Sequence, residues 1–368
     1  MSTSLEIGIL GLPNVGKTTL FNALTKAGVE TNNCLYSTVE PNVGMVDVPD
    51  ERLNRLAEMY KPKKITQTSI RFVDIAGLGK GASTGAGLGN KFLSHIRQVD
   101  AVVQVVRCFS DENVMHVEGR INPANDMDIL NTELCLADLE SLEKRLERTK
   151  KLLKGGDKKP LVEIEVLKRI IDHLGSAQPA RKAGLTGEEM DLVRDMNLLT
   201  LKPVLYVANI DEKDAADPSG GPLFQAVQDW AVAEGAEAIA VCTKLEAEIS
   251  ELPNEEAAAF LQEMGIAEPG LNKLIKAGYR LLDLISFLTA GTPEVRAWTI
   301  RRGTKAQHAA GKIHSDIERG FIRAEIVAYD DLMASGGFHA AKEKGLVRLE
   351  GKEYIMKDGD VTNFRFNV

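Results

Sequence analysis

Short apolar runs, each bounded by turn residues, recur along the chain and alternate with helical patterns. The runs are LEIGIL (5–10), IRFVDI (70–75), AVVQVV (101–106), PVLYVAN (203–209) and AIAVC (238–242). Runs of this length that are rich in β-branched residues suit parallel strands buried on both faces of a sheet. Helical patterns follow at 18–26, 90–98 and 222–234. We therefore predict an α/β domain with a doubly wound parallel sheet.

The alternation is interrupted between about residues 130 and 200. Apolar residues there keep a heptad-like spacing in two stretches, which are Leu139, Leu142, Leu146 and Leu153, then Ile164, Leu167, Ile171 and Leu174. The turn-like GGDKKP (155–160) separates them, and two such seams joined by a short turn favour an antiparallel coiled-coil hairpin. Because the α/β pattern resumes at Pro203, the hairpin is predicted to be an insertion.

After about residue 282 the pattern becomes strand-rich. EVRAWTI (294–300) and FIRAEIV (321–327) alternate apolar and polar residues, and the last residues resemble a hairpin around Asp358-Gly359. We divide the chain accordingly into a first part of the α/β domain (1–129), the helical insertion (130–201), a second part of the α/β domain (202–281) and a small C-terminal domain (282–368).

The composition is that of a soluble globular protein. Of 368 residues, 44% are hydrophobic and 27% are charged, and no stretch approaches the roughly 18 apolar residues that a membrane span needs. The four cysteines stand far apart, which fits a reducing compartment and suggests neither a zinc site nor a disulfide frame. The N-terminus shows no signal-peptide pattern. We expect a cytoplasmic protein with no membrane partner.

The net charge of −8 argues against non-specific coating of nucleic acid. One segment departs from this average. Basic residues crowd the tip end of the insertion, at Lys144, Arg145, Arg148, Lys150, Lys151, Lys154, Lys158 and Lys159. Such a run is either a solvated coiled-coil face or a contact to a phosphate backbone on a projecting arm.

GLPNVGKT (11–18) matches the phosphate-binding pattern G-x-x-x-x-G-K-[ST] and lies where that loop must, between a strand and a helix. Its glycines let backbone N–H groups close around phosphates, and the helix N-terminus adds its positive end. Lys17 is predicted to reach the β- and γ-phosphates and to take part in catalysis, and the Thr18 hydroxyl to ligate Mg²⁺. The predicted phosphate-binding residues are Asn14, Val15, Gly16, Lys17, Thr18, Thr19 and, further along the chain, Gly77.

D-I-A-G (74–77) follows the second buried strand and supports this prediction. The Asp74 carboxylate is placed to hold Mg²⁺ through water, and the Gly77 N–H to meet a γ-phosphate. Thr38, in LYSTVEPNVG (35–44), is the candidate switch threonine that closes over Mg²⁺. The predicted cofactor is therefore Mg²⁺, held by Thr18, Thr38 and Asp74. We interpret the glycine-rich segment 77–90 as a second switch that reorders with the γ-phosphate.

Four long segments carry a more specific signal. They are GLPNVGKTTLFNALTKA (11–27), FVDIAGLGKGAS (72–83), NPANDMDILNTELCLADLE (122–140) and AAGKIHSDIERGFIRAE (309–325). In these segments, and over essentially its full length, the chain resembles the Obg-like ATPases of the YchF group. The resemblance implies a P-loop NTPase G domain with a coiled-coil insertion and a C-terminal TGS domain of ubiquitin-like β-grasp form. It also implies ATP preferred over GTP, and ribosome association. We expect a monomer that contacts the large subunit and its RNA through the insertion and the TGS domain.

The predicted base-binding residues follow two later strands. Asn209, Ile210 and Glu212 stand where a GTP-binding domain would have Asn-Lys-x-Asp, and Cys242 and Thr243 border the base from the next strand. Guanine is selected by an Asp that accepts hydrogen bonds from N1–H and the 2-amino group, and adenine offers neither donor. Glu212 moves this carboxylate by one methylene, while Asn209 is still able to serve adenine. Chemistry by itself predicts relaxed specificity, and the family pattern shifts the prediction to ATP.

The chain lacks the residue that usually orients the attacking water, because Leu78 occupies the position where many GTPases have a Gln. Slow intrinsic turnover is expected unless another residue or a partner orients the water. His116 is the candidate within the chain, since a neutral imidazole accepts a proton near pH 7. A His after a strand is also often structural, so both roles stay open. Lys80 and Arg97 could neutralise transition-state charge, although their spacing does not single them out.

Three functions fit these residues. The first is a Mg²⁺-dependent ATPase switch that engages the ribosome, with switch loops ordered by a γ-phosphate and released after hydrolysis. The second is a nucleotide-gated adaptor for ribosome or RNA whose turnover is incidental, which Leu78 favours. The third is a GTPase with relaxed base specificity.

Overall fold

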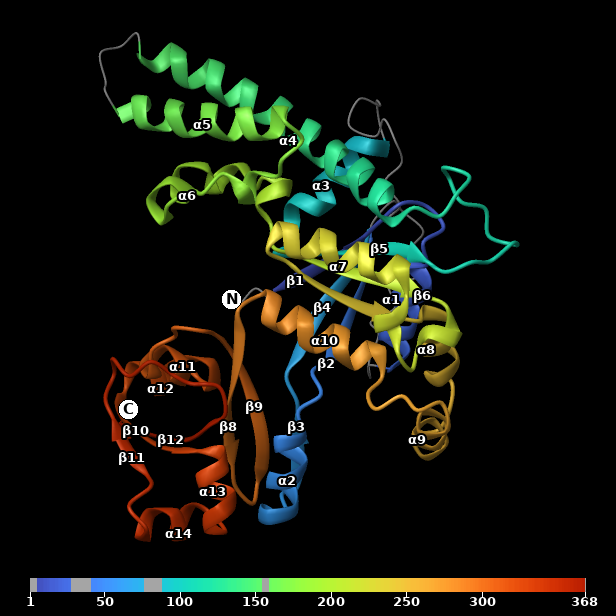
Figure 1. The fold of residues 1–368 in the computed structure, drawn as a ribbon. Coiled ribbons are helices and arrows are strands. Elements are labelled where there is room, and N and C mark those ends of the chain that lie inside the picture. Colours follow the sequence, from blue (N-terminus) through green and yellow to red (C-terminus); the bar gives the residue numbers. More distant parts are fainter. Residues whose placement is uncertain (1–4, 28–40, 76–87, 154–158, 368) are drawn as a thin grey trace. The chain divides into compact units, whose positions relative to one another are not determined.

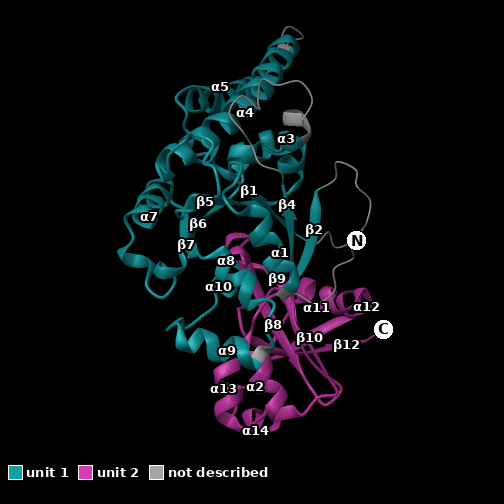
Figure 2. Ribbon diagram, turned by 90° about the vertical axis from the view of Figure 1, so that its right-hand side faces the viewer, with its two compact units in different colours: residues 1–46, 71–274 teal, residues 47–70, 275–368 magenta. Residues whose placement is uncertain are grey.

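The computed structural model describes residues 5–27, 41–75, 88–153 and 159–367 of the chain. The chain forms two compact units, the first from residues 1–46 and 71–274 and the second from residues 47–70 and 275–368 (Figure 2). Each unit contains a six-stranded sheet. Within the described ranges, no helix combines the length and the apolar character that crossing a membrane requires.

The sheet of the first unit has the strand order β2-β4-β1-β5-β6-β7. Its strands are β2 (Asn42–Asp47), β4 (Ser69–Asp74), β1 (Glu6–Leu10), β5 (Ala101–Cys108), β6 (Val204–Ile210) and β7 (Glu237–Val241). From β4 to β7 each neighbouring pair is parallel, which confirms the five apolar runs as strands of a parallel sheet. The strand order reverses beside β1. Ligands of open α/β sheets bind at such a point, beyond the carboxyl ends of the strands.

Both faces of this sheet are buried. Along β6, Tyr206 and Ala208 belong to the main hydrophobic core, while Leu205 and Val207 point to the opposite face and are also fully buried, because successive side chains alternate. The helices around the sheet are α1 (Lys17–Ala27), α3 (Leu88–Gln98), α7 (Pro222–Glu234), α8 (Thr243–Ile249) and α9 (Asn254–Glu263) (Figure 1). Helix α10 (Gly270–Leu281) crosses the boundary between the units.

The predicted insertion is a pair of helices, α4 (Pro123–Leu153) and α5 (Lys159–Gly175), which run side by side (Figure 1). Their seam is a separate hydrophobic cluster whose members include Leu139, Leu142, Leu146, Leu167, Ile171 and Leu174. Helix α4 begins before the predicted boundary at residue 130, because its first turns serve the sheet. Met127 and Leu130 of this helix are buried in the main core instead of the hairpin seam.

A short helix, α6 (Gly187–Val193), and three 3-10 turns return the chain from the hairpin to β6; the turns are η1 (Ala180–Lys182), η2 (Arg194–Met196) and η3 (Leu199–Leu201). Asp138 of α4 fixes this return. Its fully buried carboxylate accepts hydrogen bonds from Leu199 N at 2.9 Å and from both Thr200 N and Thr200 Oγ1 at 2.8 Å. Two further 3-10 turns, η4 (Glu212–Asp214) and η5 (Pro218–Gly220), follow β6.

The sheet of the second unit has the order β11-β10-β12-β8-β9-β3. Its strands are β11 (Arg348–Glu350), β10 (Phe321–Ala328), β12 (Asp360–Phe366), β8 (Leu284–Ala290), β9 (Glu294–Arg301) and β3 (Lys64–Thr66). The β8–β9 and β10–β12 pairs are antiparallel, whereas β12 runs parallel to β8. Around the sheet lie α2 (Glu51–Tyr60), α11 (Ala306–Ile313), α12 (Ser315–Arg319), α13 (Tyr329–Ser335) and α14 (Phe338–Glu343).

The predicted hairpin around Asp358-Gly359 is wrong. Strand β12 begins at Asp360 and pairs with β10 and β8. The residues before it form turns instead of a partner strand, because Asp358 is held by a distant backbone amide and Asp360 closes a local turn. Asp358 Oδ1 accepts a hydrogen bond from Ser286 N at 2.8 Å, and Asp360 Oδ2 accepts from Lys357 N at 2.9 Å.

Residues 47–70 belong to the second unit, although the sequence placed them inside the first α/β segment. Leu53 and Leu56 of α2 are fully buried in a cluster with Leu288 and Val327, and β3 pairs in parallel with β9. The apolar spacing of α2 is visible in the sequence, but its partner lies more than two hundred residues away. The boundaries between the compact units thus differ from the predicted domain limits at residues 129, 201 and 281. Those three limits remain predictions.

Candidate nucleotide site

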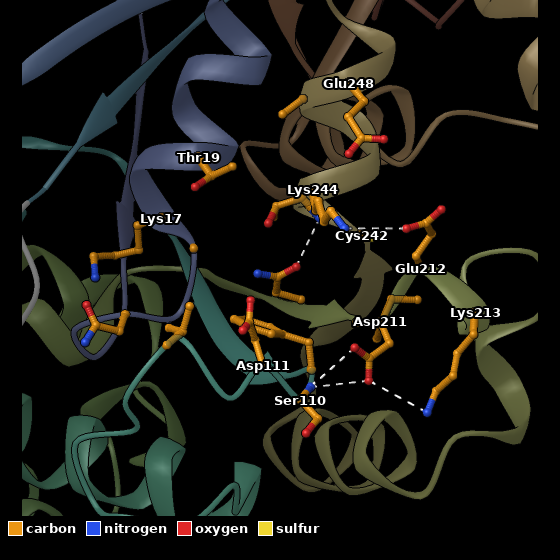
Figure 3. A pocket seen from close by; sticks show the side chains of 18 of the residues that line it. Lys17, Thr19, Ser110, Asp111, Asp211, Glu212, Lys213, Cys242, Lys244 and Glu248 are labelled. Atoms are coloured by element: carbon orange, nitrogen blue, oxygen red, sulfur yellow. Dashed lines mark hydrogen bonds and ion pairs between the residues drawn. The ribbon is translucent and has the colours of Figure 1, made fainter.

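A cavity of about 1120 Å³ lies in the first unit, at the carboxyl ends of β1, β5, β6 and β7. Figure 3 shows Lys17 and Thr19 on one side of it and Asp211, Glu212, Lys213 and Lys244 on the other. The cavity therefore brings the predicted phosphate-binding and base-binding residues together. Its volume exceeds the roughly 300–1,000 Å³ of common ligand pockets, so it has room for a nucleotide.

The phosphate loop owes its shape to two glycines. A Cβ on Gly11 would lie 2.5 Å from the Val105 carbonyl oxygen, and one on Gly16 would lie 2.4 Å from Asn209 Nδ2. Gly16 also has a φ of 97°, which side chains disfavour. The loop thus packs directly on β5 and β6, and its last residues lead into the N-terminus of α1 at Lys17.

Lys17 is folded back onto its own loop. Its Nζ donates a hydrogen bond to the Leu12 carbonyl oxygen at 2.7 Å, and the residue is only 7% exposed. Burial lowers the pKa of Lys17 to about 8, against the opposing effect of the Asp74 carboxylate. A buried ammonium that donates to a neutral carbonyl gains from any anion that reaches it.

Thr18 and Asp74, both predicted to hold Mg²⁺, lie next to each other. The Thr18 hydroxyl donates to Asp74 Oδ2 at 3.3 Å, while Asp74 Oδ1 is buried and has no hydrogen-bond partner among the described residues. Burial raises the pKa of Asp74, and Thr18 and Lys17 work against this rise. A hydroxyl beside an unsatisfied carboxylate oxygen is a fitting donor set for Mg²⁺, which prefers oxygen ligands. Thr38 and Gly77, the other predicted contacts, lie outside the described residues.

Asn209 ties the two ends of the cavity together. Its Nδ2 donates to the Val15 carbonyl oxygen at 2.9 Å, and its Oδ1 accepts from Thr243 N at 3.0 Å. The residue is 3% exposed. Its amide therefore uses one donor and one acceptor position for bonds within the protein. These bonds hold the phosphate loop, β6 and the start of α8 in one arrangement.

The other predicted base contacts differ in exposure. Ile210 and Cys242 are buried lining residues, and burial raises the pKa of the Cys242 thiol. Glu212 lies at the rim, where its Oε2 is 3.8 Å from Lys244 Nζ. Sequence reasoning missed several lining residues, which are Phe109, Ser110, Val114, Ala247, Glu248 and Met264. Phe109, Ser110 and Val114 lie in the loop after β5, and Ala247 and Glu248 lie in α8. They share no local motif, but the position of the loop at the carboxyl end of a predicted strand is a signal that could have found it.

His116 is brought next to the phosphate loop but not into the cavity lining. Asn14 Nδ2 donates to the carbonyl oxygen of the preceding residue, Met115, at 3.2 Å. The His116 ring is 6% exposed, its Nε2 lies 2.9 Å from Asp126 Oδ2, and its Nδ1 accepts a hydrogen bond from Glu118 N at 3.1 Å. Both ring nitrogens are therefore engaged within the protein.

Arg97 lies away from the cavity, at the base of the helical hairpin. Its guanidinium donates to Ser141 Oγ at 3.0 Å and to the Met196 carbonyl oxygen at 3.3 Å. It thus links α3 to the insertion, a position that does not suit direct neutralisation of phosphate charge. Leu78 and Lys80 lie outside the described residues.

Comparison with known proteins places the chain in a family. A sequence profile described as a 50S ribosome-binding GTPase matches residues 6–160, and a profile for the C-terminal domain of YchF GTPases, described as a protein of unknown function, matches residues 284–367. The ribosome-binding ATPase YchF of Bacillus subtilis is 56% identical over 99% of this chain and 100% of its own length. The YchF of Haemophilus influenzae is 52% identical over 99% of both chains. The chain belongs to the YchF family.

A solved YchF structure agrees with this assignment. The YchF GTPase of Schizosaccharomyces pombe matches this fold with a TM-score of 0.86 and 39% identity, and covers 99% of this chain and 98% of its own. The predicted fold is thereby confirmed as a P-loop G domain with a coiled-coil insertion and a C-terminal β-grasp domain. The names of these YchF proteins differ in the nucleotide, ATPase for the curated relatives and GTPase for the solved structure.

Proposed function

We propose that this protein is a Mg²⁺-dependent nucleoside triphosphatase that prefers ATP to GTP and acts as a slow nucleotide switch on the ribosome. The names of its relatives, ribosome-binding ATPases, support the activity and the partner. The observation that carries the proposal is one continuous cavity, which joins a complete phosphate-binding loop to a base end where Glu212 replaces the guanine-reading Asp. We expect it to act in the cytoplasm.

Two features of the base end support ATP. The Glu212 carboxylate lies 3.8 Å from the Lys244 ammonium, so it is drawn toward a cation instead of being reserved for the two donors of guanine. Asn209 keeps only one donor and one acceptor position free after its bonds to Val15 and Thr243. A guanine that buries N1–H and the 2-amino group without partners pays a penalty that adenine does not.

The phosphate end supports a metal-dependent reaction. Thr18 Oγ1 and the Asp74 carboxylate would hold Mg²⁺, with Thr38 as the third predicted ligand, and the unsatisfied Asp74 Oδ1 is the observation that favours this set. When bound, Mg²⁺ would offset the negative charge of the β- and γ-phosphates. Lys17 would exchange the Leu12 carbonyl oxygen for a phosphate oxygen, which gives its buried charge an anionic partner.

We assign the role of general base to His116. Leu78 is unable to orient a water molecule, and His116 is carried by the loop that touches the phosphate loop through Asn14 and Met115. In this structure both ring nitrogens are occupied, so turnover in this state is slow. Ordering of the loop on a nucleotide or a ribosome would then govern the rate.

For the ribosome contact we propose the helical hairpin and the TGS domain, against RNA of the large subunit. Three basic residues of the hairpin are neutralised by acids: Lys144 pairs with Glu140, Arg145 with Glu163 and Asp195, and Lys150 with Glu147. Arg148 and Lys151 are exposed and form no ion pair within the described ranges. These two charges are available to phosphates, at the cost of little internal rearrangement.

Calorimetric titration of ATP and of GTP with Mg²⁺ into nucleotide-free protein tests the base preference. Tighter ATP binding is expected, because guanine lacks its Asp. Equal affinities would show a base-blind site, in which the cellular excess of ATP decides occupancy. Tighter GTP binding would show that Glu212 still makes the paired hydrogen bonds, and the preference proposed here would fall.

Co-sedimentation with ribosomes tests the hairpin. The double variant Arg148→Glu/Lys151→Glu should weaken binding and make the remainder less sensitive to salt, since each lost phosphate contact lowers the salt dependence. The matched control is Lys144→Glu, which changes a charge that Glu140 already neutralises and should weaken binding less. Equal binding by all three proteins would reduce the basic segment to a solvated helix face.

The second candidate, an adaptor with incidental turnover, is favoured by Leu78 alone. Under that function His116→Ala protein that has lost hydrolysis would still cycle on the ribosome, because its turnover is incidental to binding. Under the switch function the same variant should bind ATP normally and lose turnover by about 100-fold, the common contribution of a general base.

A further inference from the structure

The bonds around His116 define its tautomer. Glu118 N is a backbone donor, so Nδ1 must present a lone pair to it, and a neutral ring then carries its proton on Nε2. That proton points at Asp126 Oδ2, 2.9 Å away. The nitrogen able to accept a proton is therefore Nδ1, and the nitrogen held by the carboxylate is Nε2.

Asp126 is buried, so its carboxylate charge acts strongly on the His116 ring beside it. It lies in the first turn of α4, is 3% exposed, and its Oδ1 has no hydrogen-bond partner in the described part of the chain. The titratable and charged groups facing it are His116 and Glu118 from the loop, and Arg107 and Cys108 from β5. Burial raises the pKa of Asp126, and the His116 ring and Arg107 oppose that rise.

The loop that carries His116 is also held by Arg107, which faces Asp126 from β5. Arg107 is buried and donates hydrogen bonds to the carbonyl oxygens of Phe109, Asp111 and Val114, at 3.3, 3.2 and 2.9 Å. The loop is thus fixed up to Val114 from β5 and again at His116 from α4. Between His116 and α4 the bond from Glu118 N belongs to a tight turn, in which Gly119 N also donates to the His116 carbonyl oxygen at 3.0 Å.

We propose that Asp126 is the positioning residue of the hydrolytic reaction, which fixes His116 with Nε2 protonated and makes Nδ1 the basic nitrogen. This inference rests on the proposed role of His116 as general base. Activation then requires that ordering of the loop bring Nδ1 to the cavity, where it exchanges its bond from Glu118 N for one to a water molecule, while the bond between Asp126 and His116 is kept. The same arrangement of acid, imidazole and nucleophile serves hydrolases of unrelated folds.

The step balances without a further reagent. The water oxygen forms a bond to the γ-phosphorus as its proton passes to Nδ1, and the bond between the γ-phosphorus and the bridging oxygen breaks toward the leaving diphosphate. The imidazolium formed carries protons on both nitrogens and faces the Asp126 carboxylate, which stabilises its charge. The proton on Nδ1 then returns to the phosphate product, so that His116 is neutral for the next cycle.

The test is the pH profile of turnover in Asp126→Asn. Asn matches the shape of Asp126, and it is free to turn its oxygen toward Nε2 because no described residue bonds to Oδ1 and fixes the rotation. The variant thus removes the charge and keeps the bond. The acidic limb of the kcat profile should move to lower pH, because the imidazolium loses a counter-ion at hydrogen-bond distance. The plateau should fall about tenfold, while ATP affinity and Tm stay close to wild type.

Asp126→Glu is the conservative partner of this variant. It retains the negative charge on a side chain that is one methylene longer. The acidic limb of the kcat profile should therefore return toward its wild-type pH, even if the maximal kcat stays low. A wild-type limb in Asp126→Asn, together with the loss of turnover in His116→Ala, would overturn the positioning role and leave His116 as the base. Unchanged turnover in His116→Ala would instead overturn the proposed base itself.

A second pair of variants addresses Nδ1 directly. Glu118→Pro removes the N–H that occupies Nδ1, whereas Glu118→Ala loses the same carboxylate and keeps the donor. Turnover without ribosomes should be several-fold higher in the proline variant than in the alanine variant, at equal ATP affinity. Equal turnover in the two, with ATP binding intact in both, would show that the Glu118 bond does not restrain the base, and would overturn the choice of Nδ1.

Discussion

The two ends of the nucleotide cavity are built on different principles. At the phosphate end, backbone geometry and helix direction do most of the positioning, and Asp74 Oδ1 has no hydrogen-bond partner among the residues that the structure describes. At the base end, the side chains that would meet the base already bind other parts of the protein. Asn209 holds Val15 and Thr243, and Glu212 lies close to Lys244.

This contrast shows why the phosphate end fixes its ligand closely, whereas the base end selects weakly between bases. A phosphate offers the same charge and oxygen geometry in ATP and GTP, so a loop that fits one fits both. Base choice requires free donors and acceptors in fixed places, and every side chain tied up elsewhere weakens it. The comparison leads to four expectations, which differ in whether ATP and GTP respond together.

Loss of the Lys17 ammonium should have the largest effect. Lys17→Ala is expected to lower the affinity for ATP and for GTP equally, by at least about 100-fold, since a charged hydrogen bond to phosphate is removed. Calorimetric titration of both nucleotides measures the effect. A loss confined to one nucleotide would mean that Lys17 also senses the base. The phosphate end and the base end would then not act independently.

Asn209→Ala should weaken both nucleotides by about 30-fold, because the Val15 carbonyl and the Thr243 N–H are left buried without partners. Tm should fall by a few degrees for the same reason. Titration and thermal unfolding provide the measurements. If Asn209 acts as a base reader, the ATP-to-GTP affinity ratio would change while Tm stayed constant.

Alkaline pH should weaken nucleotide binding through Lys17, whose pKa is lowered to about 8. Below about pH 7 the free protein already carries the charge that phosphate needs, so affinity is constant. Above pH 8 the ammonium must regain a proton on binding, and at pH 9 the affinity should be about tenfold lower. Titrations in buffers of different ionisation enthalpy would measure the proton uptake. Lys17→Arg is the matched control, since Arg stays charged and should remove the pH dependence.

The smallest effect is expected at the rim. Glu212→Asp shortens the carboxylate by one methylene and takes it away from Lys244, which should raise GTP affinity about threefold with little change for ATP. Ile210 is left unchanged in this variant because it is buried in the main core, where a Lys would destabilise the fold. Parallel loss of both nucleotides would show that Glu212 supports the cavity instead of selecting the base.

Much of the fold could be read from local patterns. The five apolar runs became parallel strands, and the leucine spacing gave the hairpin seam with Leu142 and Leu167 buried in it. The failures came where a segment depends on distant partners. Residues 47–70 pack in the second unit, and the turn at Asp358 is set by bonds to Ser286 and Arg52.

The sequence by itself determined the phosphate end, because the residues from Gly11 to Thr18 are continuous and their chemistry is carried by backbone amides, one ammonium and one hydroxyl. Only the tertiary structure decided how Asn209 and His116 are used. Their partners, Val15 for one and Asp126 for the other, come from other elements, and the folded chain alone shows which of their hydrogen-bonding positions are already taken. A side chain has few such positions, so function at these residues depends on what the fold leaves free.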